Sequence, residues 1–480
     1  MEKKFEIINS IYLSNIEENS GEKLYDNVLA LKNVALYSNQ NIRNYLNNIN
    51  PILRKKYQKL LFEKEQLLYN NSKETELLLN KKQRDLIVEI NSQEQFKILN
   101  PKSISWKNIR DYLRDDEVAI EIINVPENIK GKNDRRYYAL IINKLCKSPK
   151  IVSLFKESEL LKVLDKNGQT KERIEKLYQN ESVELYQLVW KKIEDETLNK
   201  KNVFLSVSGT LHTISFPALL ISKNVNLTYL GSTKDLLKNE NQISNKNKIS
   251  IFGDIEYGKL NETNTSKLRY TNLNFQMLPY SKKEVNQIKE KFEKKNLKEI
   301  LMFTKNTATE SNFRNINSTK TDIIHVATHG FYNKYGRNLD NLNDNTIEND
   351  LLKTGLVFAN ANKHLIDKKN DGIISSFEIA QMDLSGVDLV VLSACETGLG
   401  DIKGSEGVFG LQRAFKLAGV KSMIVSLWQV PDKSTSELMV HFYEFYLDGF
   451  SKKEALKKAQ NIIKEKYKSP FYWAGFVLLE

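Results

Sequence analysis

The chain has 480 residues, and its 72 lysines and arginines against 60 aspartates and glutamates give a formal net charge of +12. The hydrophobic fraction of 40 %, with only 20 glycines and 8 prolines, excludes a wholly disordered or collagen-like chain. Two cysteines exclude a disulfide framework, and with only five histidines they leave little for a structural zinc cluster. The sequence contains neither an apolar run near the ~20 residues of a membrane span nor a signal peptide, so we expect a cytoplasmic protein that makes no membrane contact.

Residues 1–100 are predicted to form an α-helical region. Apolar residues recur there at spacings of three and four, first between Gly21 and Leu31 and then after Pro51. Pro51 suits the first turn of a helix, and residues 70–72 interrupt the pattern before the next helix. We therefore expect helical hairpins or a truncated repeat in this region.

The pattern changes after Pro101 to short β-type runs that alternate with helices, which predicts an α/β fold with a parallel sheet. The length divides into two α/β halves, residues 101–248 and residues 249–480. The strands expected in the first half are 117–123, 137–142, 150–155 and 202–207, and those in the second half are 249–252, 321–328, 387–393, 422–427 and 475–479. The expected helices are 157–164, 183–194, 284–292, 405–417, one capped by Asp432 that ends near Gly449, and one with a capping box formed by Ser451 and Glu454.

Two strands of the second half end at a reactive side chain. The run TDIIHVATHGF ends at His329, and VDLVVLSACETGLGD ends at Cys395. If both strands are parallel in one sheet, both residues emerge at the same edge, where open α/β sheets carry their catalytic sites. A thiolate beside an imidazole can attack an amide, and the imidazole can protonate the leaving amine. The backbone N–H groups of Gly330 and Cys395 are placed to stabilise the oxyanion.

Other candidates for chemistry are weaker. Cys146 has no comparable setting and is interpreted as structural, as is His212. His325 precedes His329 by four residues, but a His-x-x-x-His pair binds metal chiefly on helices. The run GLGDIKG at 398–404 lacks the third glycine of a dinucleotide loop, and the chain has no G-x-x-x-x-G-K-[ST] phosphate loop. The sequence therefore predicts neither a metal ion nor a cofactor.

Several motifs, in order along the chain, resemble the CHAT family of caspase-like, separase-related cysteine peptidases. They are SGTLHTISFPALL, LTYLGSTKDLL, HVATHGF, LVVLSACETGLGD, EGVFGLQRAFKLAGVKSMIVSLWQVPD and PFYWAGFVLLE. The resemblance runs from about Trp106 to Glu480. It implies a caspase-like sandwich in which an inactive half precedes an active half, and a cysteine endopeptidase with His329 as general acid-base and Cys395 as nucleophile.

The resemblance also implies limited, regulated cleavage of protein substrates, in bacterial members often linked to defence or cell death. Glu396, Asp401 and Glu406 are candidates for a substrate pocket that favours a basic side chain, although loop solvation or charge at a helix N-terminus is the simpler explanation for each of them. A regulatory protein partner is expected at the N-terminal helices.

Two alternatives to a peptidase stay open. One is a catalytically silent scaffold that binds a protein partner through the helices before Pro101. The other is a nucleic-acid binder that uses the +12 charge, but the lysines alternate with glutamates in segments such as KKEVNQIKEKFEKK, which is typical of solvated helix faces, so we expect no nucleic-acid partner.

Overall fold

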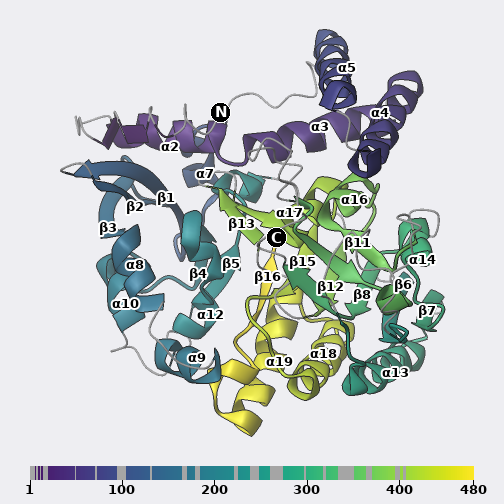
Figure 1. Ribbon diagram of the computed structural model, residues 1–480. Helices are drawn as coiled ribbons and strands as arrows, with labels where there is room; N and C mark the ends of the chain where they lie inside the picture. Colours follow the sequence, from purple (N-terminus) through teal and green to yellow (C-terminus); the bar gives the residue numbers. More distant parts are fainter. Residues whose placement is uncertain are drawn as a thin grey trace.

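The computed structural model describes the following residues: 6, 9–10, 12–13, 20–48, 50–70, 73–93, 104–129, 132–164, 170–178, 184–220, 225–237, 248–259, 274–296, 299–316, 320–332, 351–363, 370–394, 400–403 and 407–480. Across these residues a large sheet runs through the molecule, with helices on its faces and the N-terminal helices along one side (Figure 1).

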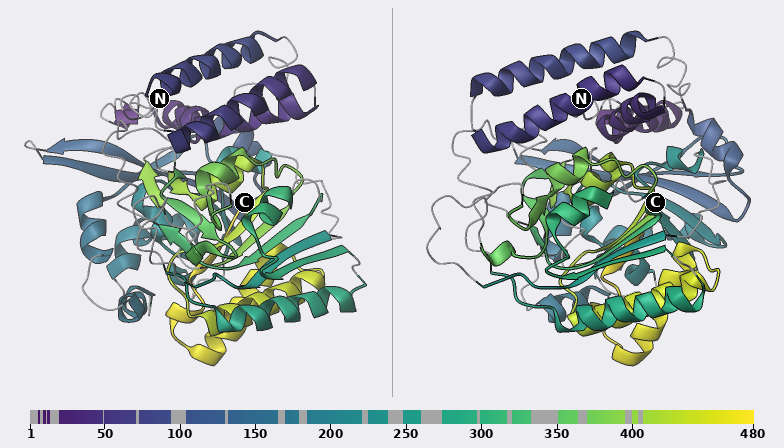
Figure 2. Two further views of the ribbon diagram at one scale, coloured as in Figure 1. Left: turned by 45° about the vertical axis from the view of Figure 1, so that its right-hand side comes forward. Right: turned by 90° about the vertical axis from the view of Figure 1, so that its right-hand side faces the viewer.

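The N-terminal region is helical, as its spacing predicts. Its described helices are α2 (Ser20–Leu31), α3 (Val34–Asn48), α4 (Pro51–Asn70) and α5 (Lys73–Ser92). Pro51 begins α4, and the interruption after Asn70 separates α4 from α5, so both boundaries expected from the sequence are confirmed. The helices α4 and α5 form an antiparallel pair beside α3 (Figure 2).

The large sheet of the described residues has eleven strands in the order β3-β2-β1-β4-β5-β16-β15-β12-β8-β6-β7. Their bounds are β1 (Glu117–Ile129), β2 (Lys132–Asn143), β3 (Lys150–Lys156), β4 (Asn202–Ser206), β5 (Asn226–Tyr229), β6 (Lys248–Ile255), β7 (Glu299–Lys305), β8 (Ile323–Ala327), β12 (Leu389–Ser393), β15 (Ser422–Ser426) and β16 (Phe476–Leu479). We call β1–β5 the first strand group and β6, β7, β8, β12 and β15 the second strand group.

The second strand group is wholly parallel, as predicted, but the first is not. Strands β1, β2 and β3 pair antiparallel, and only β1, β4 and β5 are parallel to one another. The connections between β1, β2 and β3 are too short for the crossover that parallel pairing needs. The C-terminal strand β16 lies between the groups, parallel to β5 and antiparallel to β15. The α/β fold class is confirmed, whereas the division into domains at residues 100 and 248 stays a prediction.

Helices cover both faces of the second strand group (Figure 2). One face carries α13 (Pro279–Lys294), α18 (Asp432–Leu447) and α19 (Lys452–Tyr467), and the other carries α16 (Ser376–Gln381) and α17 (Leu411–Ala418). The remaining described α-helices are α7 (Trp106–Tyr112), α8 (Glu157–Leu164), α9 (Thr170–Tyr178), α10 (Glu184–Val189), α11 (Glu194–Thr197), α12 (Phe216–Leu219) and α14 (Glu310–Arg314).

Three helix starts differ from the sequence prediction, and the first is that of α13, which begins at Pro279 and not at residue 284. The helix expected from residue 405 begins only at Leu411, because residues 407–410, which include two glycines, form strand β14 (Gly407–Gly410) instead. Asp432 starts α18 but does not cap it, since its carboxylate accepts a hydrogen bond from the Tyr280 backbone N–H at 2.8 Å. The capping box of Ser451 and Glu454 is confirmed.

Two small sheets follow the two reactive strand ends in the sequence. Strands β9 (Gly330–Tyr332), β10 (Thr354–Val357) and β11 (Ile373–Ser375) form one antiparallel sheet. Strand β13 (Gly400–Lys403) pairs with β14 in a hairpin. The sequence analysis missed all five strands, because each is only three or four residues long and shows no alternation.

Candidate active site

The strands β8 and β12 bring the two predicted catalytic segments to one edge of the sheet. Both strands are fully buried, and they pair in parallel with Ala327 opposite Ser393. His329 and Cys395 each follow this matched pair by two residues in the sequence. His329 is among the described residues, whereas Cys395 and Glu396 lie outside them. The sheet register therefore supports the predicted pairing of segments, and the thiol itself stays a prediction.

The imidazole of His329 is held by the segment that precedes α13. Its Nε2 lies 2.6 Å from the backbone carbonyl oxygen of Gln276. Since a carbonyl oxygen only accepts hydrogen bonds, Nε2 carries the proton, and Nδ1 is the nitrogen that can accept one in the neutral ring. This is the tautomer that a general base needs if the nucleophile approaches Nδ1.

Aromatic rings enclose the same imidazole. The Tyr257 and Phe275 ring centroids lie 5.1 Å and 5.6 Å from that of His329. His329 is half-buried there, and this burial lowers its pKa below the ordinary value of 6.5, while the bond to the Gln276 carbonyl opposes the shift. The ring is therefore mainly neutral at pH 7 and can accept a proton.

Hydrogen bonds fix the backbone on both sides of His329. The Val357 N–H donates to the His329 carbonyl at 3.0 Å, and the Thr328 hydroxyl donates to the Val357 carbonyl. The Tyr257 hydroxyl lies 3.0 Å from the Thr328 hydroxyl oxygen. The strand end that presents the imidazole is thus tied to β10.

The same ladder sets the direction of the Gly330 N–H group. In an antiparallel pair, successive residues point their N–H groups alternately toward and away from the partner strand. The bond from Val357 to His329 faces β10, so the N–H of the next residue, Gly330, faces away from it. Among the described strands β9 lies at the edge of its sheet, so the Gly330 N–H group faces away from that sheet.

In the first strand group, a lysine from the N-terminal region occupies the corresponding carboxyl ends of the strands. Lys32, at the end of α2, is 1 % exposed, and its Nζ donates to Glu121 on β1 at 2.8 Å and to Ser206, the last residue of β4, at 2.6 Å. The Glu121 carboxylate also accepts the Thr233 N–H at 2.6 Å and the Ser232 hydroxyl at 2.9 Å. Burial lowers the Lys32 pKa, and Glu121 opposes that shift.

The remaining histidines have structural surroundings. His325 is fully buried, and its Nε2 lies 3.0 Å from the Glu284 carboxylate on α13. His212 is half-buried beyond β4, where burial, with a smaller contribution from Lys32, lowers its pKa to about 3. His441 lies on α18 beside Glu444, as expected of a helix-face residue, whereas His364 lies outside the described residues. Within the described part of the chain, no group of three or more His, Cys, Asp or Glu residues could hold a metal ion.

Cys146 has the character of a packing residue. It is half-buried against the hydrophobic cluster that contains Trp106 and Leu140, and burial raises the pKa of its thiol. A raised pKa leaves little thiolate at neutral pH. The structure therefore supports the interpretation of Cys146 as structural.

The three carboxylates proposed for substrate recognition cannot be placed. Glu396 and Glu406 lie outside the described residues, and Asp401 belongs to β13 but its side chain is outside them. Helix α17 begins at Leu411, so Glu406 precedes its first turn in the sequence. Residues 333–350, a polar segment whose sequence is typical of a loop, also lie outside the described residues.

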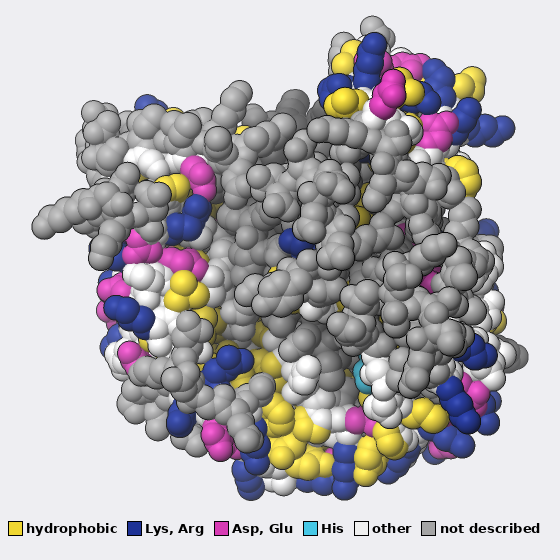
Figure 3. Space-filling view, viewed as in Figure 1, with side chains coloured by type: hydrophobic (Ala, Val, Ile, Leu, Met, Phe, Trp, Pro, Cys, Tyr) yellow, Lys and Arg dark blue, Asp and Glu magenta, His cyan; other side chains and the backbone are white. Residues whose placement is uncertain are grey.

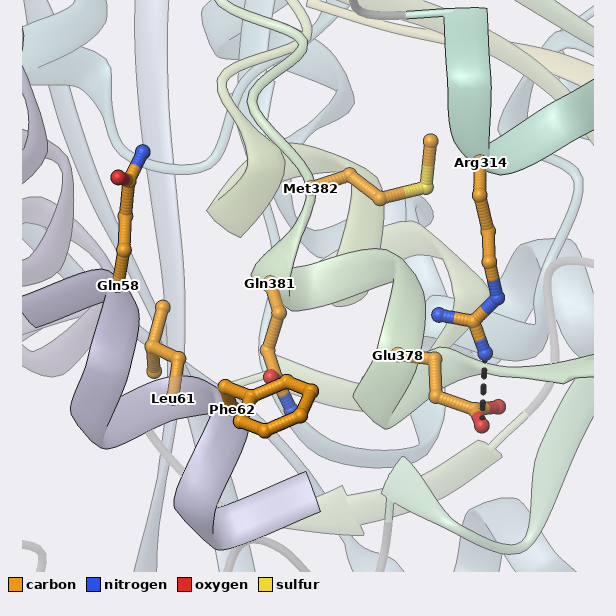
Figure 4. A pocket seen from close by; sticks show the side chains of 7 residues that line it. All are labelled: Gln58, Leu61, Phe62, Arg314, Glu378, Gln381 and Met382. Carbon is orange, nitrogen blue, oxygen red and sulfur yellow. Dashed lines mark ion pairs between the residues drawn. The ribbon is translucent and has the colours of Figure 1, made fainter. Parts of the chain in front are cut away.

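A surface groove of about 270 Å³ lies between α4 and the helices α14 and α16. Its described lining is Gln58, Leu61, Phe62, Arg314, Glu378, Gln381 and Met382 (Figure 4). Arg314 pairs there with Glu378 at 3.0 Å. None of these residues is a predicted site residue, and the groove joins the N-terminal helices to the second strand group.

Charged side chains show no single basic stripe on the face seen in Figure 3, where the described Lys and Arg residues are interspersed with Asp and Glu. The described helices include none that is long and apolar enough to cross a membrane.

The fold and the strand-end histidine define an α/β protein with a candidate catalytic edge, and comparison with known proteins identifies its family. The sequence model of the CHAT domain matches residues 179–480, more than half of the chain. The chain therefore belongs to the CHAT domain family, which confirms the resemblance.

Individual relatives are more distant. Tetratricopeptide repeat protein 28 is 33 % identical in Mus musculus and 32 % identical in Homo sapiens over 110 residues, which are 22 % of this chain and 4 % of those proteins. The structural alignment with a chain of the Saccharomyces cerevisiae separase–securin complex covers 84 % of this chain and 33 % of the other chain. The two are 12 % identical, and the TM-score is 0.43. The structural alignment with the Arg-specific cysteine proteinase gingipain R (RgpB) of Porphyromonas gingivalis covers 65 % of this chain and 67 % of the other chain. The two are 12 % identical, and the TM-score is 0.35.

Proposed function

We propose that the protein is a caspase-like cysteine endopeptidase in which Cys395 is the nucleophile and His329 the general acid-base. The observation that carries the proposal is the bond between His329 Nε2 and the Gln276 carbonyl, at the strand end whose register matches the strand leading to Cys395. Membership of the CHAT family adds support.

The proposed reaction follows from these positions. His329 Nδ1 accepts the thiol proton while Sγ of Cys395 bonds to the scissile carbonyl carbon, and the carbonyl electron pair moves to oxygen. The N–H groups of Gly330 and Cys395 stabilise that oxyanion. Collapse breaks the C–N bond as the imidazolium protonates the leaving amine. Water, deprotonated by His329, then hydrolyses the thioester and regenerates the thiol.

The proposal is tested by incubating the full chain with a cell-extract proteome and sequencing the new N-termini. We expect cleavage products with wild type that Cys395→Ala and His329→Gln do not form, while Cys146→Ser, the matched control at the other cysteine, still forms them. Equal products from wild type and Cys395→Ala would refute a peptidase.

The substrate pocket belongs to the same proposal. Glu396, Asp401 and Glu406 lie within eleven residues of Cys395 in the sequence, and carboxylates favour a lysine or arginine before the scissile bond. Sequencing of the new N-termini gives this residue directly. A preference for an apolar or acidic residue would exclude the pocket.

We further propose that the cleavage is limited and is regulated by a protein partner at the N-terminal helices, in a cytoplasmic setting. Exposed apolar side chains on α4 and α5 support a contact there, namely Ile52 at 72 %, Leu77 at 65 % and Val88 at 67 % exposure. A captured partner that is bound but never alters cleavage would favour the scaffold alternative. The silent scaffold predicts equal partner binding by wild type and Cys395→Ala with no processing by either.

A further inference from the structure

The buried side chain of Asn362 makes three hydrogen bonds beside the candidate active site. Asn362 lies in the short 3-10 turn Ala361–Lys363 after β10 and is 3 % exposed. Its Nδ2 donates to the Gly258 carbonyl at 3.1 Å and to the Phe275 carbonyl at 2.9 Å, and its Oδ1 accepts the Phe275 N–H at 2.9 Å. Both amide protons and the amide oxygen are therefore used.

These bonds hold the segment that contacts His329. Phe275 packs its ring against the imidazole, and the next residue, Gln276, supplies the carbonyl that accepts from Nε2. Residues 274–278 form neither helix nor strand. The Asn362 amide binds the peptide N–H and C=O of Phe275 and so takes the place that a ladder of backbone bonds has in a strand.

Asn362 also binds the other residue that flanks the imidazole. Its backbone N–H donates to the Tyr257 carbonyl at 2.8 Å. Tyr257, which follows the end of β6 in the sequence, packs against the His329 ring. One residue thus joins Tyr257, Gly258 and Phe275, which come from two segments on either side of the undescribed range 260–273.

We propose that Asn362 is a positioning residue that fixes the tautomer of His329. By holding Phe275 it keeps the Gln276 carbonyl against Nε2, so the proton stays on Nε2 and Nδ1 stays free to act as base. The importance of Asn362 for catalysis rests on the proposed peptidase function, whereas its effect on the His329 tautomer does not depend on that function.

The tautomer is measured by long-range ¹H–¹⁵N correlation NMR on full-length protein with ¹⁵N-labelled histidine, the His329 signals being assigned by their loss in His329→Gln. We expect wild type to carry the proton on Nε2. Asn362→Ala and Asn362→Asp, which both lose the amide donors, should show a mixture of tautomers. Asn312→Ala, which removes an amide that donates to the Thr307 carbonyl instead, should match wild type.

Steady-state cleavage of a peptide found by N-terminal sequencing adds a second measurement. We expect Asn362→Asp to lower kcat by about tenfold to a hundredfold, the range known for residues that orient a metal-bound histidine, with KM nearly unchanged. An unaltered His329 tautomer in a folded Asn362 variant overturns the proposal. If neither variant folds, a wild-type proton on Nδ1 overturns it, and one on Nε2 supports it.

The two proposals fail separately. Dependence of the tautomer on Asn362 in a protein that cleaves no substrate would leave the positioning role standing and remove the peptidase. Cys395-dependent cleavage in a protein whose His329 tautomer does not change in the Asn362 variants would support the peptidase and remove the positioning role of Asn362.

Discussion

The two strand groups differ in the side chains that lie at the carboxyl ends of their parallel strands. In the first group, Lys32 from α2 enters the strand ends and pairs with Glu121, where the exposed fraction of each side chain is 2 % or less. In the second group, the end of β8 presents His329, which is only half-buried. The comparison indicates that the first group serves as an anchor for the N-terminal helices, while the second keeps a histidine available for chemistry.

The anchoring helices also reach the second strand group. Arg43 on α3 donates to the carbonyl oxygens of Ala380 and Met382 at the end of α16, and Gln40 donates to the Lys416 carbonyl on α17. Helix α16 follows the small sheet that begins after His329, and α17 follows the hairpin after Cys395. The N-terminal helices therefore contact the helices that follow the two predicted catalytic segments in the sequence.

The largest expected effect comes from breaking the anchor in the first group. Lys32→Ala leaves Glu121 as an unpaired buried charge and should lower the free energy of unfolding by about 3–5 kcal/mol. Urea denaturation measures this. The matched control is Lys466→Ala, which breaks an exposed pair with Glu437 and should lower the free energy of unfolding far less than Lys32→Ala does. Equal small losses in both variants would show that the buried pair does not anchor α2.

A smaller loss is expected where the helices meet the second group. Arg43→Ala removes a charged donor from the Ala380 and Met382 carbonyls, and hydrogen bonds to charged groups contribute about 1.5–3 kcal/mol. The loss should appear in urea denaturation, and Arg84→Ala on the exposed side of α5 serves as the control. No difference between Arg43→Ala and Arg84→Ala would contradict the contact.

The pH dependence of stability should separate the two strand-end histidines. His212 has a folded pKa of about 3, whereas its unfolded value is near 6.5. Between these values the unfolded chain binds more protons, so the free energy of unfolding falls as pH falls, by at most about 1.4 kcal/mol per pH unit. Unfolding at several pH values should show a smaller slope in His212→Gln than in wild type. Equal slopes would mean that His212 is not held neutral.

The mildest prediction concerns the pH profile of cleavage. The His329 pKa lies below 6.5 because of burial, and a general base must be neutral. Activity should therefore be retained as pH falls until the lowered pKa is reached, and the acid limb of kcat/KM should lie below pH 6.5. An acid limb above pH 6.5 would contradict the neutral histidine that distinguishes this strand end.

The sequence predicted those segments whose structure follows from their own residue pattern. Strands β8 and β12 were predictable because continuous aliphatic runs mark strands buried on both faces, and Pro51 marked the start of α4. His329 was found because it ends such a run.

The parts that the sequence could not predict depend on distant partners. Lys32 lies in a region rich in polar residues, and its burial follows only from Glu121, 89 positions away. Gln276 acts through a backbone carbonyl, so its side-chain identity carries no signal, and Asn362 is 87 positions from the residue it holds. Antiparallel pairing of β2 and β3 could have been predicted, because only seven residues separate the expected strands 137–142 and 150–155, whereas the 13 residues between 117–123 and 137–142 left room for a crossover.

The central claim, that His329 activates Cys395, is tested most directly by the pH dependence of Cys395 alkylation in a Cys146→Ser background. The account predicts that near neutral pH iodoacetamide modifies Cys395 faster in the presence of His329 than in His329→Gln, because the neutral imidazole takes the thiol proton as the sulfur is alkylated, and that this difference disappears below the lowered pKa of His329. Equal alkylation rates of Cys395 in the presence of His329 and in His329→Gln across this pH range would contradict the account.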